Sequence, residues 1–280
     1  MRLMRAAEVP EAPRDLVFRA SRLHAVLLVG VCIAACLAMI AYGWPGRRAA
    51  YIFSAVILFF LFLLRRFITA RFHPSNWLIR VGDEGLFLHF RSYLNDHLPA
   101  DDPTVIFLAF GEIRSARLVR EYVRKPDLSR ANTTQTQVLG WIELELAIDP
   151  APLADAIATE CGRSAVPEKR WYGTSATLYR DYPMQLQAPP FLRVQWRVVP
   201  RAGAFLDALR PRVEIAPKVV VSADFSDLGG LSREDQERRL RELCQRGDTM
   251  AAIYLVRRLR GCNLTEATKL VEGLRRGPQG

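Results

Sequence analysis

Two long stretches of uncharged, apolar residues near the N-terminus are the strongest constraint on how this chain can fold. The first, AVLLVGVCIAACLAMIAYGW, runs from Ala25 to Trp44, and the second, AAYIFSAVILFFLFLL, runs from Ala49 to Leu64. A helix rises about 1.5 Å per residue, so about 20 apolar residues cross the roughly 30 Å hydrocarbon core of a bilayer. The sequence therefore predicts two transmembrane helices, over about 25–44 and 49–68.

Only a short turn, GWPGRR, separates the two stretches, so the helices must form an antiparallel hairpin within residues 25–72. Both ends of the hairpin then lie on the same side of the membrane. Cytoplasmic flanks are enriched in Lys and Arg, which predicts a multi-pass protein of the inner (plasma) membrane with both termini cytoplasmic and residues 1–24 as an N-terminal tail. The flanking arginines are Arg2, Arg5, Arg14, Arg19 and Arg22 before the first helix and Arg65, Arg66, Arg71 and Arg80 after the second, against Arg47 and Arg48 in the turn.

The composition of the first helix favours an anchor. A secretory signal peptide is disfavoured, because the apolar run is longer than a usual signal core and a second span follows directly. Small residues, namely Gly30, Ala34, Ala35 and Ala38, share roughly one face. This face predicts close packing against the second helix, with self-association as the alternative. No acid, lysine or histidine lies mid-membrane, so nothing indicates a transport pathway.

Charge and cysteine content limit the remaining function classes. The net charge of +10 and the pI of about 9.8 are compatible with nucleic-acid binding. However, the basic residues are scattered among acids, so a basic surface facing an anionic membrane leaflet is favoured and a nucleic-acid partner is disfavoured. The five cysteines form neither a disulfide framework nor a metal-binding spacing. This fits a reducing compartment, and hence a cytoplasmic location for the soluble part.

Residues 73–215 carry the pattern of a small, mainly antiparallel β domain. The segment NWLIRVGDEGLFLHF predicts a hairpin with a tight Gly-Asp-Glu-Gly turn. In the run 138–148, Trp141, Glu143 and Glu145 alternate with Ile142, Leu144 and Leu146, which predicts a half-buried strand. After Pro200, a helix is predicted that carries Ala204, Phe205, Ala208 and Leu209 on one face. Further strands are predicted at 104–110, 116–123 and 191–199.

This order of elements, behind a membrane span and opening with the W-L-I-R-V-G-D-E-G-L-F-L hairpin, resembles the bacterial pleckstrin-homology-like domains of membrane-anchored proteins. The resemblance covers about residues 76–215. It departs from the pattern in an insertion at about 149–185, whose PAPLADAIATECG portion predicts a short helix. Such a domain implies binding and not catalysis.

The C-terminal segment, residues 232–276, follows a predicted linker at 216–231 and predicts three short helices at about 233–246, 249–260 and 264–275. Ser232 with Asp235, and Asn263 with Glu266, have the spacing of capping boxes. Asp248 is expected as a further N-cap, and Gly247 and Gly261 are expected to end helices. The complete fold class predicted is therefore α+β, consisting of a transmembrane hairpin, a β domain with a closing helix, and a three-helix segment.

The run MAAIYLVRRLRGCNLTEATKLVEGL, residues 250–274, resembles the helical hairpin in the C-terminal domain of the bacterial ribosomal stalk protein. Matching types stand at Ile253, Val256, Arg257, Gly261, Leu264, Glu266, Ala267, Leu270, Val271 and Glu272. Thr265 and Thr268 replace the lysines that flank the Glu-Ala pair in that family. This departure argues against binding of ribosomal factors, and leaves Arg257, Arg258 and Arg260 as a candidate docking surface.

A search for catalytic patterns finds no phosphate-binding glycine loop, zinc spacing or nucleophile motif. Acids and histidines gather only between residues 89 and 102, namely His89, Asp96, His97, Asp101 and Asp102. A membrane-associated enzyme that uses this cluster is the alternative hypothesis, although a solvated loop is favoured because nothing orients His97. No catalytic residue, metal site or cofactor is assigned.

The favoured hypothesis is a non-catalytic, membrane-anchored interaction or regulatory module. It presents a cytoplasmic domain and a helical docking segment to a protein partner that the sequence does not name. Anionic lipids are a second candidate partner, held by arginines turned toward the membrane. The residues proposed for that surface are Arg114, Arg117, Arg120 and Arg124.

Overall fold

The computed structural model describes residues 1–280 except 11–14, 44–45, 129–132, 165–166, 171–172, 177, 188–189, 247 and 277–280. The chain divides into two compact units. The N-terminal unit comprises residues 1–116 and 143–216, and the C-terminal unit comprises residues 117–142 and 217–280. Each unit has its own buried core, and each is described by itself.

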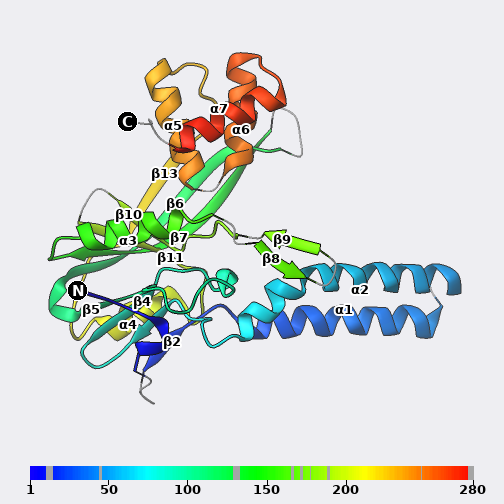
Figure 1. Ribbon diagram of the computed structural model, residues 1–280, viewed down its shortest axis with the longest axis horizontal. Helices are drawn as coiled ribbons and strands as arrows, with labels where there is room; N and C mark the ends of the chain where they lie inside the picture. The colour runs from blue at the N-terminus through cyan, green and yellow to red at the C-terminus, as the bar shows by residue number, and fades with distance from the viewer. Residues whose placement is uncertain are drawn as a thin grey trace. The chain divides into compact units, whose positions relative to one another are not determined.

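Two long helices, α1 (Arg22–Tyr42) and α2 (Arg47–Thr69), form the predicted antiparallel hairpin and lie side by side (Figure 1). The Ser21 side chain caps the start of α1, and Gly43 ends it in the left-handed conformation with φ of 63°. Both helices are long and apolar enough to cross a membrane. The two predicted segments are therefore confirmed as helices, with α1 beginning three residues earlier than expected, and their crossing of a membrane stays a prediction.

The interface between α1 and α2 differs from the prediction. Its buried residues are Ala25 and Cys36 on α1 and Ala50 and Ser54 on α2. The partly buried Val29, Cys32 and Met39 complete the α1 side at alternating spacings of three and four residues, as in left-handed helix pairs. The predicted small-residue face is exposed instead, so the prediction that it packs against the second helix is wrong. Its residues are Gly30, Ala34, Ala35 and Ala38.

The N-terminal unit contains a five-stranded antiparallel sheet in the order β1-β5-β4-β3-β2. The predicted hairpin with its turn at 82–85 is confirmed as β3 and β4. The expected tail at 1–24 is wrong in part, because β1 pairs with β5 and β2 pairs with β3. The strands are β1 (Arg2–Met4), β2 (Leu16–Phe18), β3 (Ile79–Val81), β4 (Gly85–His89) and β5 (Val105–Ala109).

A second sheet has the order β10-β11-β7-β6-β12, with β13 also paired to β6. Its pairs β12/β6 and β13/β6 are parallel, which adds to the mainly antiparallel pairing that the sequence predicted for residues 73–215. The predicted linker at 216–231 is likewise corrected, since it contains β13. The strands are β6 (Ile113–Pro126), β7 (Thr134–Leu146), β10 (Met184–Gln187), β11 (Phe191–Gln195), β12 (Glu214–Ile215) and β13 (Val219–Asp224), with β8 (Pro167–Arg170) and β9 (Gly173–Ala176) as a separate pair.

Two helices of the N-terminal unit match predictions. The helix expected in the insertion is α3 (Ala151–Cys161), and the closing helix is α4 (Ala202–Leu209). Phe205 and Leu209 of α4 are fully buried, and Phe205 meets Phe18 edge-on at 5.4 Å between ring centroids. Short 3-10 turns are η1 (Ala6–Glu8), η2 (Ala70–Phe72), η3 (Tyr93–Asn95) and η4 (Phe110–Glu112). The resemblance to pleckstrin-homology-like domains stays a prediction.

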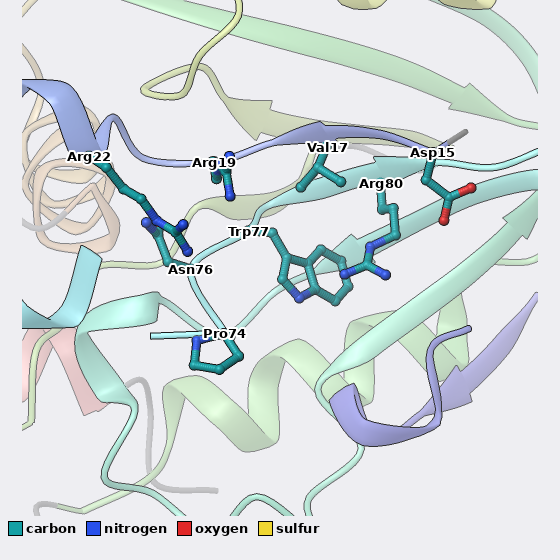
Figure 2. Close-up of a pocket in the computed structure, with 8 residues that line it drawn as sticks. All are labelled: Asp15, Val17, Arg19, Arg22, Pro74, Asn76, Trp77 and Arg80. Carbon is teal, nitrogen blue, oxygen red and sulfur yellow. The ribbon is translucent and has the colours of Figure 1, made fainter. Parts of the chain in front are cut away.

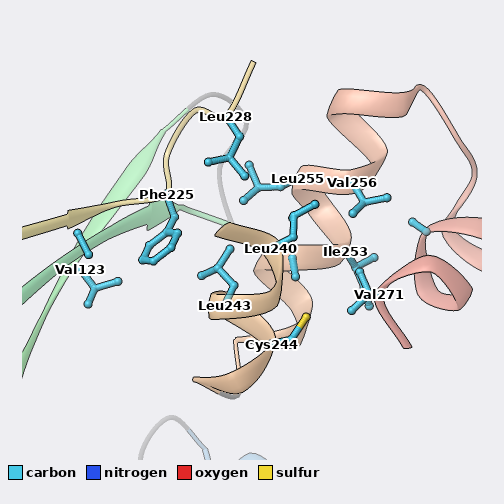
Figure 3. Close-up of a cluster of buried hydrophobic side chains, with 13 residues drawn as sticks. Val123, Phe225, Leu228, Leu240, Leu243, Cys244, Ile253, Leu255, Val256 and Val271 are labelled. Carbon is cyan, nitrogen blue, oxygen red and sulfur yellow. The ribbon is translucent and has the colours of Figure 1, made fainter. Parts of the chain in front are cut away.

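The C-terminal unit packs α5 (Arg233–Gln245), α6 (Thr249–Arg260) and α7 (Leu264–Arg276) around one apolar core (Figure 3). Val123 and Phe225 from the sheet side face helix residues such as Leu243. The three predicted helices are confirmed to within one residue at each end.

The predicted caps of these helices are mostly confirmed. Ser232 accepts the backbone N–H of Asp235, and Asn263 and Glu266 form a reciprocal capping box. Gly261 ends α6 with φ of 62°. Asp248 occupies the N-cap position without a side-chain cap and instead pairs with Lys125, while the cap expected at Gly247 lies outside the described residues.

Candidate functional site

A cavity of about 300 Å³ opens in the N-terminal unit at the base of the helical hairpin. It lies where β2 leads into α1 and where the chain leaves η2 after α2. Figure 2 shows Trp77 between the Arg22 and Asn76 side of the cavity and the Arg80 and Asp15 side. Its lining residues are Asp15, Val17, Arg19, Arg22, Pro74, Asn76, Trp77 and Arg80.

A buried hydrogen-bond network holds the two chain segments at this base together. The Asn76 side chain accepts the N–H of Ala20 and donates to the carbonyls of Ala20 and Arg71, at 3.2, 3.1 and 2.5 Å. Arg71 Nη1 donates to the carbonyl of Ser21 at 3.1 Å. Arg22 Nε donates to the carbonyl of Arg71 at 3.2 Å. The residue that begins α1 is thereby fixed to the residues that follow α2.

The charge of the cavity is positive, because three guanidinium groups face a single carboxylate, that of Asp15. Arg80 is largely buried, donates Nη1 to the carbonyl of Pro10 at 3.3 Å and lies over the Trp77 ring at 5.2 Å. Arg19 is exposed at the rim, and Arg22 is half-buried. Three arginines around an indole make a site suited to an anion with several acceptor oxygens.

This cavity was missed by the sequence analysis, which used Arg19, Arg22 and Arg80 only to orient the hairpin. One signal was available. Arginines immediately before the first span and shortly after the second must meet if the hairpin closes. The missing information was the pairing of β2 with β3, which brings residues 16–18 beside residues 79–81.

The four arginines predicted as a lipid surface all lie on β6, but they do not form one array. Arg114 is exposed and pairs with Glu145 at 2.9 Å. In the C-terminal unit, Arg120 and Arg124 are exposed on one face, whereas Arg117 shares the alternation of the buried Val119. Arg124 donates Nε to Thr134 Oγ1 at 3.2 Å.

The predicted docking arginines occupy the last turn of α6. Arg257 and Arg258 are exposed, and Arg260 pairs with Glu237 of α5 at 3.3 Å. Positive side chains there interact favourably with the negative end of the helix dipole, which gives a structural reason for their presence. They remain accessible to a partner on the surface of the C-terminal unit.

The acid and histidine cluster of residues 89–102 is not assembled into a site. His89 is buried between the Trp77 carbonyl and Thr104 Oγ1, at 3.3 and 3.2 Å. Burial, with a smaller contribution from Arg91, lowers the pKa of His89 to about 4, so its ring is neutral at pH 7. Asp96 lies 3.3 Å from His73, and Asp101 is 92% exposed. Asp96 is therefore explained by its pairing with His73, and Asp101 by its exposure to solvent.

Asp102 belongs instead to an ion-pair network that the sequence analysis missed. Arg91 donates to Glu160 at 2.7 Å and to Asp102 at 2.7 Å, and Arg163 contacts both acids at 2.8 Å. Burial alone would raise the pKa of Asp102, but the hydrogen bonds from Arg91 and Arg163 hold it below its usual value. With both acids matched by arginines, this network ties α3 to the segment between β4 and β5 rather than presenting a base.

His97 differs from the other members of the cluster. Both of its ring nitrogens are buried, and neither has a hydrogen-bond partner among the described residues. Within the same described part of the chain, no group of three or more His, Cys, Asp or Glu side chains is placed to hold a metal ion.

Comparisons of the chain with protein-family models, with curated proteins and with solved structures gave no match. The class of the protein therefore rests on its own architecture. It is a mixed α/β protein with two main sheets and with two helices that are long and apolar enough to cross a membrane.

Proposed function

We propose that this protein is a non-catalytic, membrane-anchored interaction module. One observation carries the proposal: the large apolar side chains of α1 and α2 point away from the hairpin interface. Leu37 is 63% exposed and Phe59 is 58% exposed, while the buried positions hold small residues. Water-soluble proteins rarely leave so large a contiguous apolar surface uncovered. Lipid tails cover it without cost.

The dimensions and flanks of the hairpin support this assignment. The 21 residues of α1 extend about 31 Å at 1.5 Å per residue, close to the thickness of a bilayer core. Arg65 and Arg66 close the apolar run of α2, and Arg65 lies over the ring of Phe62 at 4.2 Å. The excess of arginine on the flanks supports a multi-pass topology in the inner membrane with both termini cytoplasmic.

The C-terminal unit supports the interaction role. It has an apolar core of its own. All of its residues follow the hairpin in the chain, and a membrane anchor alone would not need them. Its exposed Arg257 and Arg258 form a basic edge suited to an acidic protein partner. Such a surface raises association rates through electrostatic attraction.

The anchor is tested by fractionating cells that express the full-length protein. We expect the protein in the membrane pellet, resistant to extraction with carbonate at alkaline pH and released by detergent. Recovery in the supernatant without detergent would contradict membrane anchoring.

The docking edge is tested by affinity capture from solubilised native membranes. The double variant R257E/R258E should lose captured partners, and R233E/R238E should retain them. Arg233 and Arg238 are matched controls, because they are exposed helix arginines of the same unit, at 82% and 68% side-chain exposure. Equal capture by the two variants would remove Arg257 and Arg258 from the proposal.

A further inference from the structure

We propose that the cavity lined by Arg19, Arg22, Trp77 and Arg80 binds a phosphate group, carried either by the headgroup of an anionic phospholipid or by a soluble phosphate ester. The lipid form of this inference rests on the proposed membrane anchoring. The site is separate from the arginines of β6 that the sequence predicted as a lipid surface.

Position is the first argument. Arg22 is the first residue of α1, and Pro74 follows the end of η2 at Phe72 by two residues. The cavity therefore lies at the level where both apolar helices end. In a bilayer, that level is the headgroup layer, where lipid phosphates lie and where lysine and arginine of the cytoplasmic side attract anionic lipids.

Available donors are the second argument. Among the described residues, the guanidinium group of Arg19 has no hydrogen-bond or ion-pair partner. Arg22 uses Nε on the carbonyl of Arg71, and its two terminal nitrogens have no assigned partner within the described chain. A guanidinium group presents parallel N–H donors that match two oxygens of a phosphate.

Preorganisation is the third argument. Asn76 is 2% exposed, and its side chain fixes the carbonyls of Ala20 and Arg71. The backbone that carries Arg22 is therefore held before any ligand arrives, which lowers the entropy lost on binding. Trp77 is buried except for 7% and supplies an apolar wall beside Arg80. An indole with an apolar body and one N–H donor suits the boundary between headgroup and acyl chain.

The experiment uses full-length protein in detergent and counts bound ligand by native mass spectrometry. The probes are dioctanoyl phosphatidylglycerol, dioctanoyl phosphatidylcholine, glycerol phosphate and inorganic phosphate. We expect saturable binding of phosphatidylglycerol, weakened at least about tenfold in R19Q/R22Q, because each charge-assisted bond to phosphate contributes about that factor. The matched control is R2Q/R5Q, which removes two exposed arginines from the same N-terminal segment outside the cavity.

Each probe distinguishes one source of the phosphate. Binding of phosphatidylglycerol alone supports the lipid headgroup. Binding of glycerol phosphate or inorganic phosphate, lost in R19Q/R22Q, supports the soluble ester. Equal binding of phosphatidylcholine and phosphatidylglycerol, equal losses in the two double variants, or no binding of any probe would overturn the inference.

Folding and anchoring are controlled separately. The variant R19K/R22K keeps both charges but not the paired donors, and should bind phosphate between the wild type and R19Q/R22Q. A melting temperature for R19Q/R22Q close to that of the wild type shows an intact fold. If R19Q/R22Q stays in the membrane pellet but loses the lipid, the site is confirmed. If the wild type binds no phosphate but sediments with membranes, only this inference fails.

Discussion

The hairpin α1–α2 and the bundle α5–α7 are both compact helical assemblies, yet they distribute apolar residues in opposite ways. In the bundle, Leu243 and Val271 are fully buried, and arginines such as Arg257 lie outside. In the hairpin, Ala50 and Ser54 are inside, and leucines and phenylalanines lie outside.

This difference supports the proposal that the two parts of the chain have different surroundings. In water, apolar burial drives helices together, so the largest apolar side chains go inside. In lipid, burial gains little, because acyl chains are as apolar as leucine, and small residues at the interface let the helices approach closely. The contrast is therefore the physical basis for proposing that the hairpin lies in a membrane, and substitutions at matched positions can test it.

The largest effect is expected from shortening a leucine. Leu255 in α6 is 1% exposed and Leu58 in α2 is 51% exposed. Leu255→Ala should destabilise the C-terminal unit by about 2–5 kcal/mol through lost burial and the cavity that remains. Leu58→Ala should change the stability of the hairpin by less than about 1 kcal/mol, because lipid fills the space. Hydrogen exchange of both regions in full-length protein measures both effects. Equal losses would contradict the comparison.

A charge on an exposed apolar position separates the two surroundings most directly. Val31 in α1 is 66% exposed and Met250 in α6 is 61% exposed. At the centre of a span, arginine costs about 2.5–3.5 kcal/mol of insertion free energy, whereas on a water-facing surface it changes stability by roughly 0.5 kcal/mol or less. Val31→Arg should therefore lower the fraction of protein in carbonate-washed membranes, and Met250→Arg should not. If both variants behave like wild type, α1 faces water.

Acidic pH is expected to lower the stability of the N-terminal unit more than that of the C-terminal unit. The C-terminal unit contains no histidine, and in the N-terminal unit burial lowers the pKa of His89 from 6.5 to about 4. Below pH 6.5 the unfolded chain gains a proton that the folded unit does not bind, so stability falls as pH falls, by about 1.4 kcal/mol per pH unit. Down to about pH 5 the loss is about 2 kcal/mol. The opening free energy from hydrogen exchange, corrected for the intrinsic exchange rate at each pH, should fall in β4 but not in α6, and His89→Gln should reduce the difference.

Much of the fold could be predicted because its signals are local. Capping residues at Ser232, Gly261 and Asn263 set the helix ends of the bundle, and the Gly-Asp-Glu-Gly turn set the β3/β4 hairpin. Strands β1 and β2 have only three residues each and are defined by partners far along the chain. The parallel pairing of β13 with β6 is equally remote, so no local pattern indicated it.

Buried charge explains two other differences from the sequence analysis. The run 138–148 was predicted to be half-buried, but Trp141 and Glu143 are also buried. Trp141 donates to Glu121 at 3.1 Å, and Arg193 pairs with Glu143 at 2.6 Å, which offsets part of the cost of burying these polar groups. The candidate cavity was missed for a related reason. Its arginines come from segments on either side of the hairpin, and only the folded chain brings them together.

The smallest expected effect tests the inside of the hairpin. Ala50 is 1% exposed, and near it Cys36 Sγ of α1 approaches the Ser54 carbonyl of α2 at 3.9 Å, so the two backbones are close. Ala50→Leu adds three carbons at this contact and should destabilise the hairpin by about 1–3 kcal/mol through overpacking. Ile52→Leu, at a position 64% exposed on the same helix, is the matched control and should have no effect. Thermal unfolding of the full-length protein in detergent measures both variants. If Ala50→Leu is as stable as the wild type, α1 and α2 do not pack through their small residues. The hairpin would then differ from the bundle only in the apolar side chains on its outer surface.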